Sequence, residues 1–223
     1  MSATGVWIVG VVPDERIADL LLTAARSAPS TATAAGPAPS PPTRVDMATE
    51  LNWWRSKPTE SLFHPSAAAP GSWRADDDAY RLSAFLDNCR DGSDPVEALR
   101  DAVMDEFPPT TGEDLFAAVA RKASPFSALA YALGPDATLQ LPGWFGDFLL
   151  DADEVRTHLP AATEALTLTG ATRQRAVERI HAWMTGLGDD PDHDAEELLD
   201  GPLRVLRHAA RTGRGAAAQV RWY

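Results

Sequence analysis

The stretch that decides the fold is "GVWIVGVVPDERIADLLL", residues 5–22. Its first part combines glycine with Val, Ile and Trp and ends at a proline, which is typical of a buried strand. Pro13 suits the first position of a helix, and Asp14 and Glu15 oppose the helix dipole in the first turn. Apolar residues then recur at helical spacing. The chain therefore begins with a strand followed by a helix.

The other end of the chain predicts a second strand. Residues 216–223, "AAAQVRWY", follow a helical pattern that ends at Gly213, a residue suited to a C-cap. We expect the N-terminal and C-terminal strands to share a small sheet that is packed by helices. The predicted fold class is α+β, predominantly helical, with residues 1–223 forming a single domain.

Most of the sequence between these strands predicts helices with capping residues at their starts. Residues 111–123, "TGEDLFAAVARKA", carry Thr111 and Asp114 at the capping-box positions and are expected to form one of these helices. Residues 138–141 break the helical pattern, and we expect a short strand there.

Two prolines are expected to interrupt helices in the C-terminal third. Asp151 caps a predicted helix, and Pro160 should kink or split it. Pro202 suits the first position of a further helix, so we expect the preceding short helical turn to end before it. The pattern between these two regions, "TRQRAVERIHAWMTGLG", predicts a regular amphipathic helix.

Composition limits the setting of the protein. Residues 29–43 contain only Pro, Ala, Ser, Thr and Gly, and we expect them to form a disordered Pro/Ala-rich insertion. The single cysteine, Cys89, excludes an intramolecular disulfide bond. The N-terminus lacks the pattern of a signal peptide, and no apolar run is long enough to cross a membrane.

The charge limits the partners. The formal net charge is −12 at pH 7, with 20 basic and 32 acidic residues among the 223. Nucleic-acid binding and adsorption to an anionic membrane both require clustered Lys and Arg, so we expect neither. The charge fits a cytoplasmic protein whose partner, if it has one, is a basic protein.

Four aromatic residues are the candidate binding residues. Trp53 and Trp54 lie in residues 45–74, a stretch interrupted by prolines and with little periodicity. Trp144 and Phe145 lie in a predicted loop, "PGWFGD". Aromatic side chains in irregular segments either wrap a core or line a binding groove, and the sequence leaves both interpretations open.

The most acidic stretch is "GLGDDPDHDAEELLDGPL", residues 186–203. Its alternating aspartates could suit a hard cation, but the spacing lacks the glycine and the distal glutamate of an EF-hand loop. A helix start explains the same residues, because Asp194 can cap a helix and Glu197 can close a capping box. We therefore expect no metal here.

A helical metal site is the alternative. Glu178 and His181 have the Glu-x-x-His spacing of di-metal helical bundles, but a bundle site needs a second such motif, and the sequence has one. The histidines of this region are His158, His181, His193 and His208. The residues of the alternative metal site are Glu178, His181, Asp192, His193 and Asp194.

Known catalytic motifs are missing from the sequence. It has no Gly-x-Ser-x-Gly nucleophile elbow, no Ser-x-x-Lys and no phosphate-binding glycine loop. "GRGAAAQ" contains Gly-x-Gly, but a helix precedes it and a strand follows, which is the wrong order for a dinucleotide loop. We expect no cofactor.

Both ends of the chain resemble a known family. The initial strand with "PDERIADLL", the later "LDADEVRTHLPAATEAL" and the final "LRVLRHAARTGRGAAAQVRWY" together resemble the YfbM-like group of small bacterial proteins. The resemblance covers about a third of the chain. It implies an α+β fold and names no catalytic residue.

The sequence therefore favours a non-enzymatic binding or accessory protein that acts through a protein-interaction surface. An immunity-like or antitoxin-like role against a basic partner is one concrete form of this hypothesis. The alternative is a metal-dependent hydrolase that uses acids and histidines of residues 154–197.

Overall fold

The computed structural model describes residues 3–27, 47–57, 61–67, 73–88, 99–107, 111–188 and 193–223. The predicted insertion at residues 29–43 and Cys89 lie outside these ranges. In chain order, the elements are β1 (Thr4–Val12), α1 (Asp14–Ser27), α2 (Met47–Arg55), β2 (Phe63–Pro65), β3 (Trp73–Ala75), α3 (Asp77–Asn88), α5 (Arg100–Asp105), β4 (Leu115–Arg121), α6 (Pro125–Leu133), α7 (Pro135–Thr138), β5 (Phe148–Leu150), α8 (Ala152–Leu166), α9 (Gly170–Gly186), α10 (Ala195–Thr212) and β6 (Gly215–Trp222).

The main sheet joins both ends of the chain. Its strand order is β4-β1-β6-β5, and every neighbouring pair is antiparallel. Strand β1 pairs with β6 over its whole length, from Gly5 opposite Trp222 to Val12 opposite Gly215. The predicted sheet of N- and C-terminal strands is confirmed, as is the predominantly helical α+β fold class.

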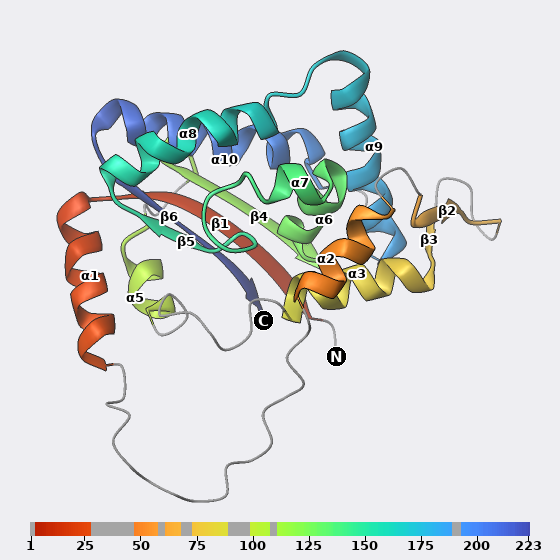
Figure 1. Ribbon diagram of the computed structural model, residues 1–223, viewed down its shortest axis with the longest axis horizontal. Coiled ribbons are helices and arrows are strands. Elements are labelled where there is room, and N and C mark those ends of the chain that lie inside the picture. The colour runs from red at the N-terminus through yellow and green to blue at the C-terminus, as the bar shows by residue number, and fades with distance from the viewer. Residues whose placement is uncertain are drawn as a thin grey trace, which may run out of the picture.

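Helices cover both faces of this sheet. Figure 1 shows α8 and α10 side by side above the strands, and α1 and α5 below them. Alternation along β1 explains the two layers, because successive side chains of a strand point to opposite faces. Trp7 and Val9 join the larger core under α8 and α10, whereas Val12 packs with Ile17 of α1 and Val103 of α5.

A second block of elements packs beside the sheet, formed by α2, α3, α6, α7, α9 and the β2–β3 hairpin (Figure 1). Aromatic rings hold the hairpin in place. Phe63 of β2 packs edge-on against Tyr131 of α6 and Trp183 of α9, with ring centroids 5.4 and 5.6 Å away. Gly186 leaves room for the Phe63 ring, since a Cβ there would lie 2.2 Å from it.

The helix predicted at residues 111–123 is wrong. Residues Leu115–Arg121 form strand β4, which pairs with β1 in the main sheet. Alanine favours a helix when only local propensity decides, but pairing with a distant strand overrides this preference. The expected capping residues instead form a turn, in which the Gly112 N–H donates to the Leu115 carbonyl at 2.9 Å.

The strand predicted at residues 138–141 is also wrong, because α7 covers Pro135–Thr138 and a turn follows. The Thr138 hydroxyl donates to the carbonyls of Gly134 (2.7 Å) and Ala130 (3.2 Å). These bonds fold the chain back onto the end of α6, so a helical turn replaces the extended conformation.

Neither proline ends a helix. Helix α8 runs through Pro160, and α10 runs through Pro202 as one helix from residue 195 to residue 212. A proline removes one backbone hydrogen bond, and buried contacts on both sides of it can offset that loss. In α10, Leu198 and Leu199 are buried before Pro202, and Leu206 is buried after it.

The predicted caps Asp151, Asp194 and Gly213 are confirmed, whereas the Glu197 carboxylate, expected to close a capping box, binds Arg204 instead. The Asp151 carboxylate accepts from the Asp153 and Glu154 N–H groups, and Glu154 completes the capping box of α8. The Asp194 carboxylate accepts from the Glu197 N–H at the start of α10. Gly213 ends α10 in the left-handed conformation, with φ of 65°. In the part of the chain that the structure describes, no helix is long and apolar enough to cross a lipid bilayer.

Candidate functional site

The loop before β5 forms a tight, strained turn. Trp144 and Asp147 exchange two backbone hydrogen bonds, of 2.8 and 3.1 Å. The two residues between them both have positive φ, 48° at Phe145 and 97° at Gly146. Glycine adopts such a conformation readily, but a bulky aromatic residue rarely does. Backbone strain of this kind persists only where the surrounding structure enforces it, and it is concentrated at functional sites.

Three contacts enforce this turn. The indole Nε1 of Trp7 donates to the Gly146 carbonyl at 3.1 Å in the protein interior. The Asp147 carboxylate accepts from the Val220 N–H at 2.6 Å, which ties the turn to β6. The Phe145 ring is buried and packs edge-on against Phe85 of α3 at 5.7 Å. The turn is therefore anchored to β1, β6 and α3 together.

This anchoring holds the Trp144 side chain at the surface. Trp144 is 41% exposed, and its ring packs edge-on against the Phe145 ring at 5.2 Å. Trp222, two residues beyond Val220 on β6, is exposed to a similar degree. A rigid turn thus presents one large amphipathic ring to solvent, which is the usual form of an anchor residue in a protein interface.

The other two candidate tryptophans lie on a helix. Trp53 and Trp54 belong to α2, and Trp54 is buried edge-on against Phe85 at 6.4 Å. The guanidinium of Arg81 covers the half-buried Trp53 ring, 4.1 Å from its centroid. Trp54 and Phe145 thus contact the same core residue, Phe85, and serve the core. Trp144 is the most exposed of the four aromatic residues.

A small apolar cavity lies beside the strained turn. Its volume is about 20 Å³, which is room for about one water molecule and too little for a metabolite. Apolar groups from several parts of the fold line it: Trp7, Phe126, Leu141, Pro142, Gly146, Phe148, Leu166, Pro202 and Leu206. The cavity therefore supports no small-molecule site.

The structure brings together two residues of the alternative metal site. The His181 and His193 rings face each other with centroids 4.7 Å apart and planes tilted by 49°. Glu178 accepts a hydrogen bond from the Gln174 amide at 3.0 Å, and Asp194 caps α10. Asp192 lies outside the described residues. Within the described ranges, no group of three or more His, Cys, Asp or Glu side chains is arranged to hold a metal ion.

The pKa of His181 lies below its ordinary value of 6.5, first because the ring is partly buried and second because His193 is close. Asp194 and Glu196 act in the opposite direction. The unfolded chain therefore binds a proton at His181 more readily than the folded chain does. Acidification through pH 6.5 consequently favours unfolding, and the stability that neutral His181 provides is lost as the pH falls.

We expect this loss to disappear in a His181→Gln variant. Urea denaturation between about pH 8 and pH 5 measures the free energies of unfolding of wild type and variant. Below about pH 6.5, wild type should lose stability relative to the variant. At higher pH both side chains are neutral, so the difference should be constant there. A difference independent of pH over the whole range would contradict the assigned role of His181.

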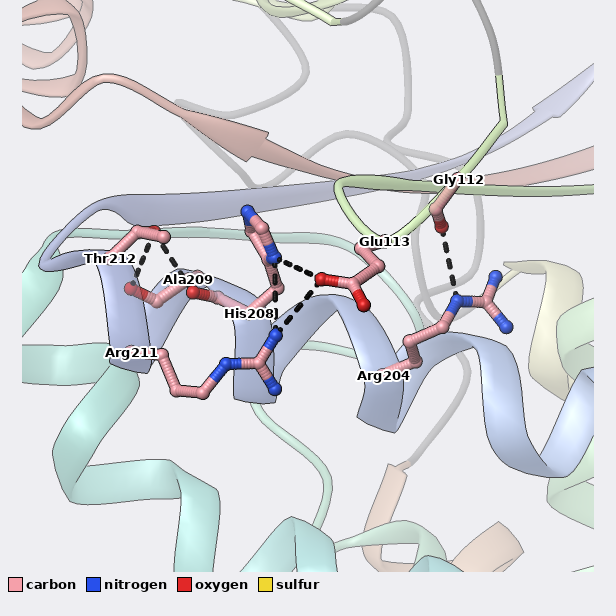
Figure 2. Close-up of polar contacts among 7 residues, drawn as sticks. All are labelled: Gly112, Glu113, Arg204, His208, Ala209, Arg211 and Thr212. Atoms are coloured by element: carbon pink, nitrogen blue, oxygen red, sulfur yellow. Dashed lines mark hydrogen bonds and ion pairs between the residues drawn. The ribbon is translucent and has the colours of Figure 1, made fainter.

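A separate polar cluster joins α10 to the turn before β4. Figure 2 shows the Glu113 carboxylate between His208 Nδ1 and the Arg211 guanidinium, at 3.0 and 3.1 Å. Arg204 donates to the Gly112 carbonyl at 3.1 Å and also binds Glu197 through both carboxylate oxygens. These contacts are ion pairs and hydrogen bonds that hold the turn against the helix, so the cluster positions the turn.

Local sequence patterns carry no signal for this cluster. Glu113 falls within a predicted helix, and its partners are nearly a hundred residues away. His208 is one of the four histidines weighed for a metal site, and the structure places it against this turn instead. His158 lies on α8, outside both groups.

Comparisons of the chain with protein-family models, with curated protein sequences and with solved structures find no match.

Proposed function

We propose that the protein is a non-enzymatic cytoplasmic binding or accessory protein that acts through an interaction surface centred on Trp144. Its partner is a basic protein, and an immunity-like or antitoxin-like role is one form that this binding could take. The observation that carries the proposal is the exposed Trp144 indole on a turn whose backbone is strained at Phe145.

The strained conformation of Phe145 supports binding because it lets one buried ring contact both the core and the exposed Trp144 indole. A residue such as asparagine or glycine at position 145 would close the same turn with less backbone strain. Phe145 instead packs against both Phe85 and Trp144, so its side chain fixes the orientation of the exposed indole. A preorganised side chain loses little conformational entropy on binding, which increases affinity.

The charge supports a basic partner. The net charge of −12 attracts a cationic protein over a distance of about the Debye length and speeds association. The exposed face of an indole also binds Lys or Arg side chains through cation–π interaction, worth about 0.5–2 kcal/mol. Long-range attraction and the local anchor therefore favour the same class of partner.

The test is affinity purification at physiological salt with wild-type protein, Trp144→Ala and Leu22→Ala as bait. Leu22 is also exposed, but it lies on α1, on the face of the main sheet opposite α8 and α10. It is therefore the matched control. We expect wild type and Leu22→Ala to retain the same basic protein. Trp144→Ala should bind that protein about 30-fold more weakly or worse, as loss of an interface anchor predicts.

Circular dichroism and thermal unfolding should show that Trp144→Ala keeps the wild-type fold. The proposal is wrong if no protein is retained at physiological salt, or if the retained protein binds all three baits equally.

Metal-dependent hydrolysis by acids and histidines of residues 154–197 is the second candidate function. The close approach of the His181 and His193 rings favours it, together with the lowered pKa of His181, which keeps an imidazole lone pair available at neutral pH. Zn²⁺ added to chelator-treated protein should then raise the melting temperature of wild type but not of His181→Ala. An unchanged wild-type melting temperature would exclude this candidate.

A further inference from the structure

Strand β4 forms one edge of the main sheet. It pairs with β1 on one side, and none of the strands among the described residues pairs with it on the other. Its side chains are unusually apolar for an edge: Val119 is 62% exposed, and Ala117 is exposed beside it. The strand contains no proline and no glycine, although proline is a device that commonly protects an edge from pairing.

The hydrogen-bond pattern shows which backbone groups point outward. Lys122 donates to the Ala3 carbonyl, and Val11 donates to the Asp114 carbonyl, so the even-numbered residues of this segment bond to β1. Hydrogen-bonded residues alternate along an antiparallel ladder. The N–H and C=O groups of Ala117 and Val119 therefore point away from β1, toward the outer side of the sheet.

Both ends of this edge are held rigidly. At its start, the Glu113 carboxylate bonds to His208 and Arg211, and the Gly112 carbonyl accepts from Arg204 (Figure 2). At its end, Lys122 adopts a positive φ of 63°, and the chain turns directly into α6. A preorganised edge pairs with another strand at a lower entropic cost than a mobile segment does.

The charges at the two ends of β4 are opposite in sign, so they complement each other when two copies of the strand run antiparallel. Glu113 and Asp114 precede the strand, and Arg121 and Lys122 end it, with an apolar centre between them. Antiparallel pairing places the acidic end of one strand against the basic end of the other. Parallel pairing would place like charges together.

From this pattern we propose that β4 is a self-association edge, at which a second copy of the chain pairs antiparallel about a two-fold axis through Ala118. In this register Ala117 lies opposite Val119 of the second copy, and Asp114 lies opposite its Lys122. Because Ala117 and Val119 carry outward backbone groups in both copies, about four intermolecular hydrogen bonds can form at the centre. The two sheets become one continuous sheet with the two-fold symmetry usual for dimers. An interface of this length is at the low end of interface sizes, so the dimer population depends on protein concentration.

The first test uses proline at two adjacent positions and sedimentation velocity over a concentration series. Val119→Pro removes an N–H that points outward, so it should leave the β1–β4 ladder intact and abolish the dimer. Wild type should approach twice the mass of the chain as its concentration rises, whereas Val119→Pro should remain a monomer with wild-type circular dichroism. Ala118→Pro is the matched control, because it removes an N–H bonded to β1 and should lower the melting temperature.

The second test exchanges charges and does not depend on proline. Asp114→Lys and Lys122→Glu each place like charges opposite one another in the homodimer, so each variant alone should dimerise about tenfold more weakly. An equimolar mixture of the two variants restores opposite charges and should recover a heterodimer. A wild type that stays monomeric at every concentration overturns the proposal. So does a dimer that survives Val119→Pro, or variants that fail to complement each other.

Discussion

Replacing Trp7 by alanine will lower the free energy of unfolding by about 3–5 kcal/mol, the range measured for buried aromatic side chains. The Trp7 indole is buried at the centre of β1 and packs edge-on against Phe116 and Phe126, each with a centroid separation of 5.2 Å. It also borders the small cavity beside the strained turn. Removing the ring enlarges a void that already exists, so the surrounding side chains can recover little of the lost contact.

Urea denaturation followed by circular dichroism measures this effect, which corresponds to a fall in melting temperature of roughly 10 °C. Trp7→Phe is the matched control, because it keeps an aromatic ring but cannot donate a hydrogen bond to the Gly146 carbonyl. We expect the control to lose about 1–3 kcal/mol, the cost of leaving a buried acceptor unsatisfied. A Trp7→Ala variant within about 1 kcal/mol of wild type would show that this ring does not hold the core.

The central pair of strands was predictable because each carries a strong local signal. Residues 5–12 combine β-branched side chains with a following proline, and Gly213 marks the helix end before the last strand. Strand β4 carries no comparable signal. Its "LFAAVAR" is short and rich in alanine, and it becomes a strand because β1 pairs with it. Local propensity alone therefore could not predict the edge strand.

The sequence indicated which residues form the candidate site but did not indicate their backbone conformation. The proline and the two glycines of "PGWFGD" indicated a loop that carries Trp144 and Phe145. The positive φ at Phe145 follows from anchors elsewhere in the chain, above all the hydrogen bond to Gly146 from Trp7, 139 residues away. A short window of neighbouring residues carries no information about contacts at such long sequence separation.

Replacing Gly143 by alanine will both destabilise the fold and weaken binding at Trp144. Gly143 has φ of +76°, and an added Cβ would lie 2.2 Å from the Asp147 carbonyl oxygen and 2.4 Å from the Phe148 Cβ. That oxygen accepts the Trp144 N–H at 2.8 Å, so the clash acts directly on the bond that closes the turn. The unfavourable backbone conformation costs about 1–2 kcal/mol. Overpacking against atoms that cannot move away adds about 1–3 kcal/mol.

Gly213→Ala separates these two contributions. Gly213 also has a positive φ, of 65°, but a Cβ added there would meet nothing within 4 Å, so only the conformational cost of about 1–2 kcal/mol applies. Urea denaturation should therefore place Gly143→Ala about 1–3 kcal/mol below Gly213→Ala. Because Gly213 is distant from the turn in the chain, its variant should bind the partner as wild type does, whereas Gly143→Ala should bind more weakly although Trp144 is intact. Equal stability of the two variants would mean that the turn can shift to accept a side chain, and a turn that shifts so easily would not hold Trp144 in one orientation.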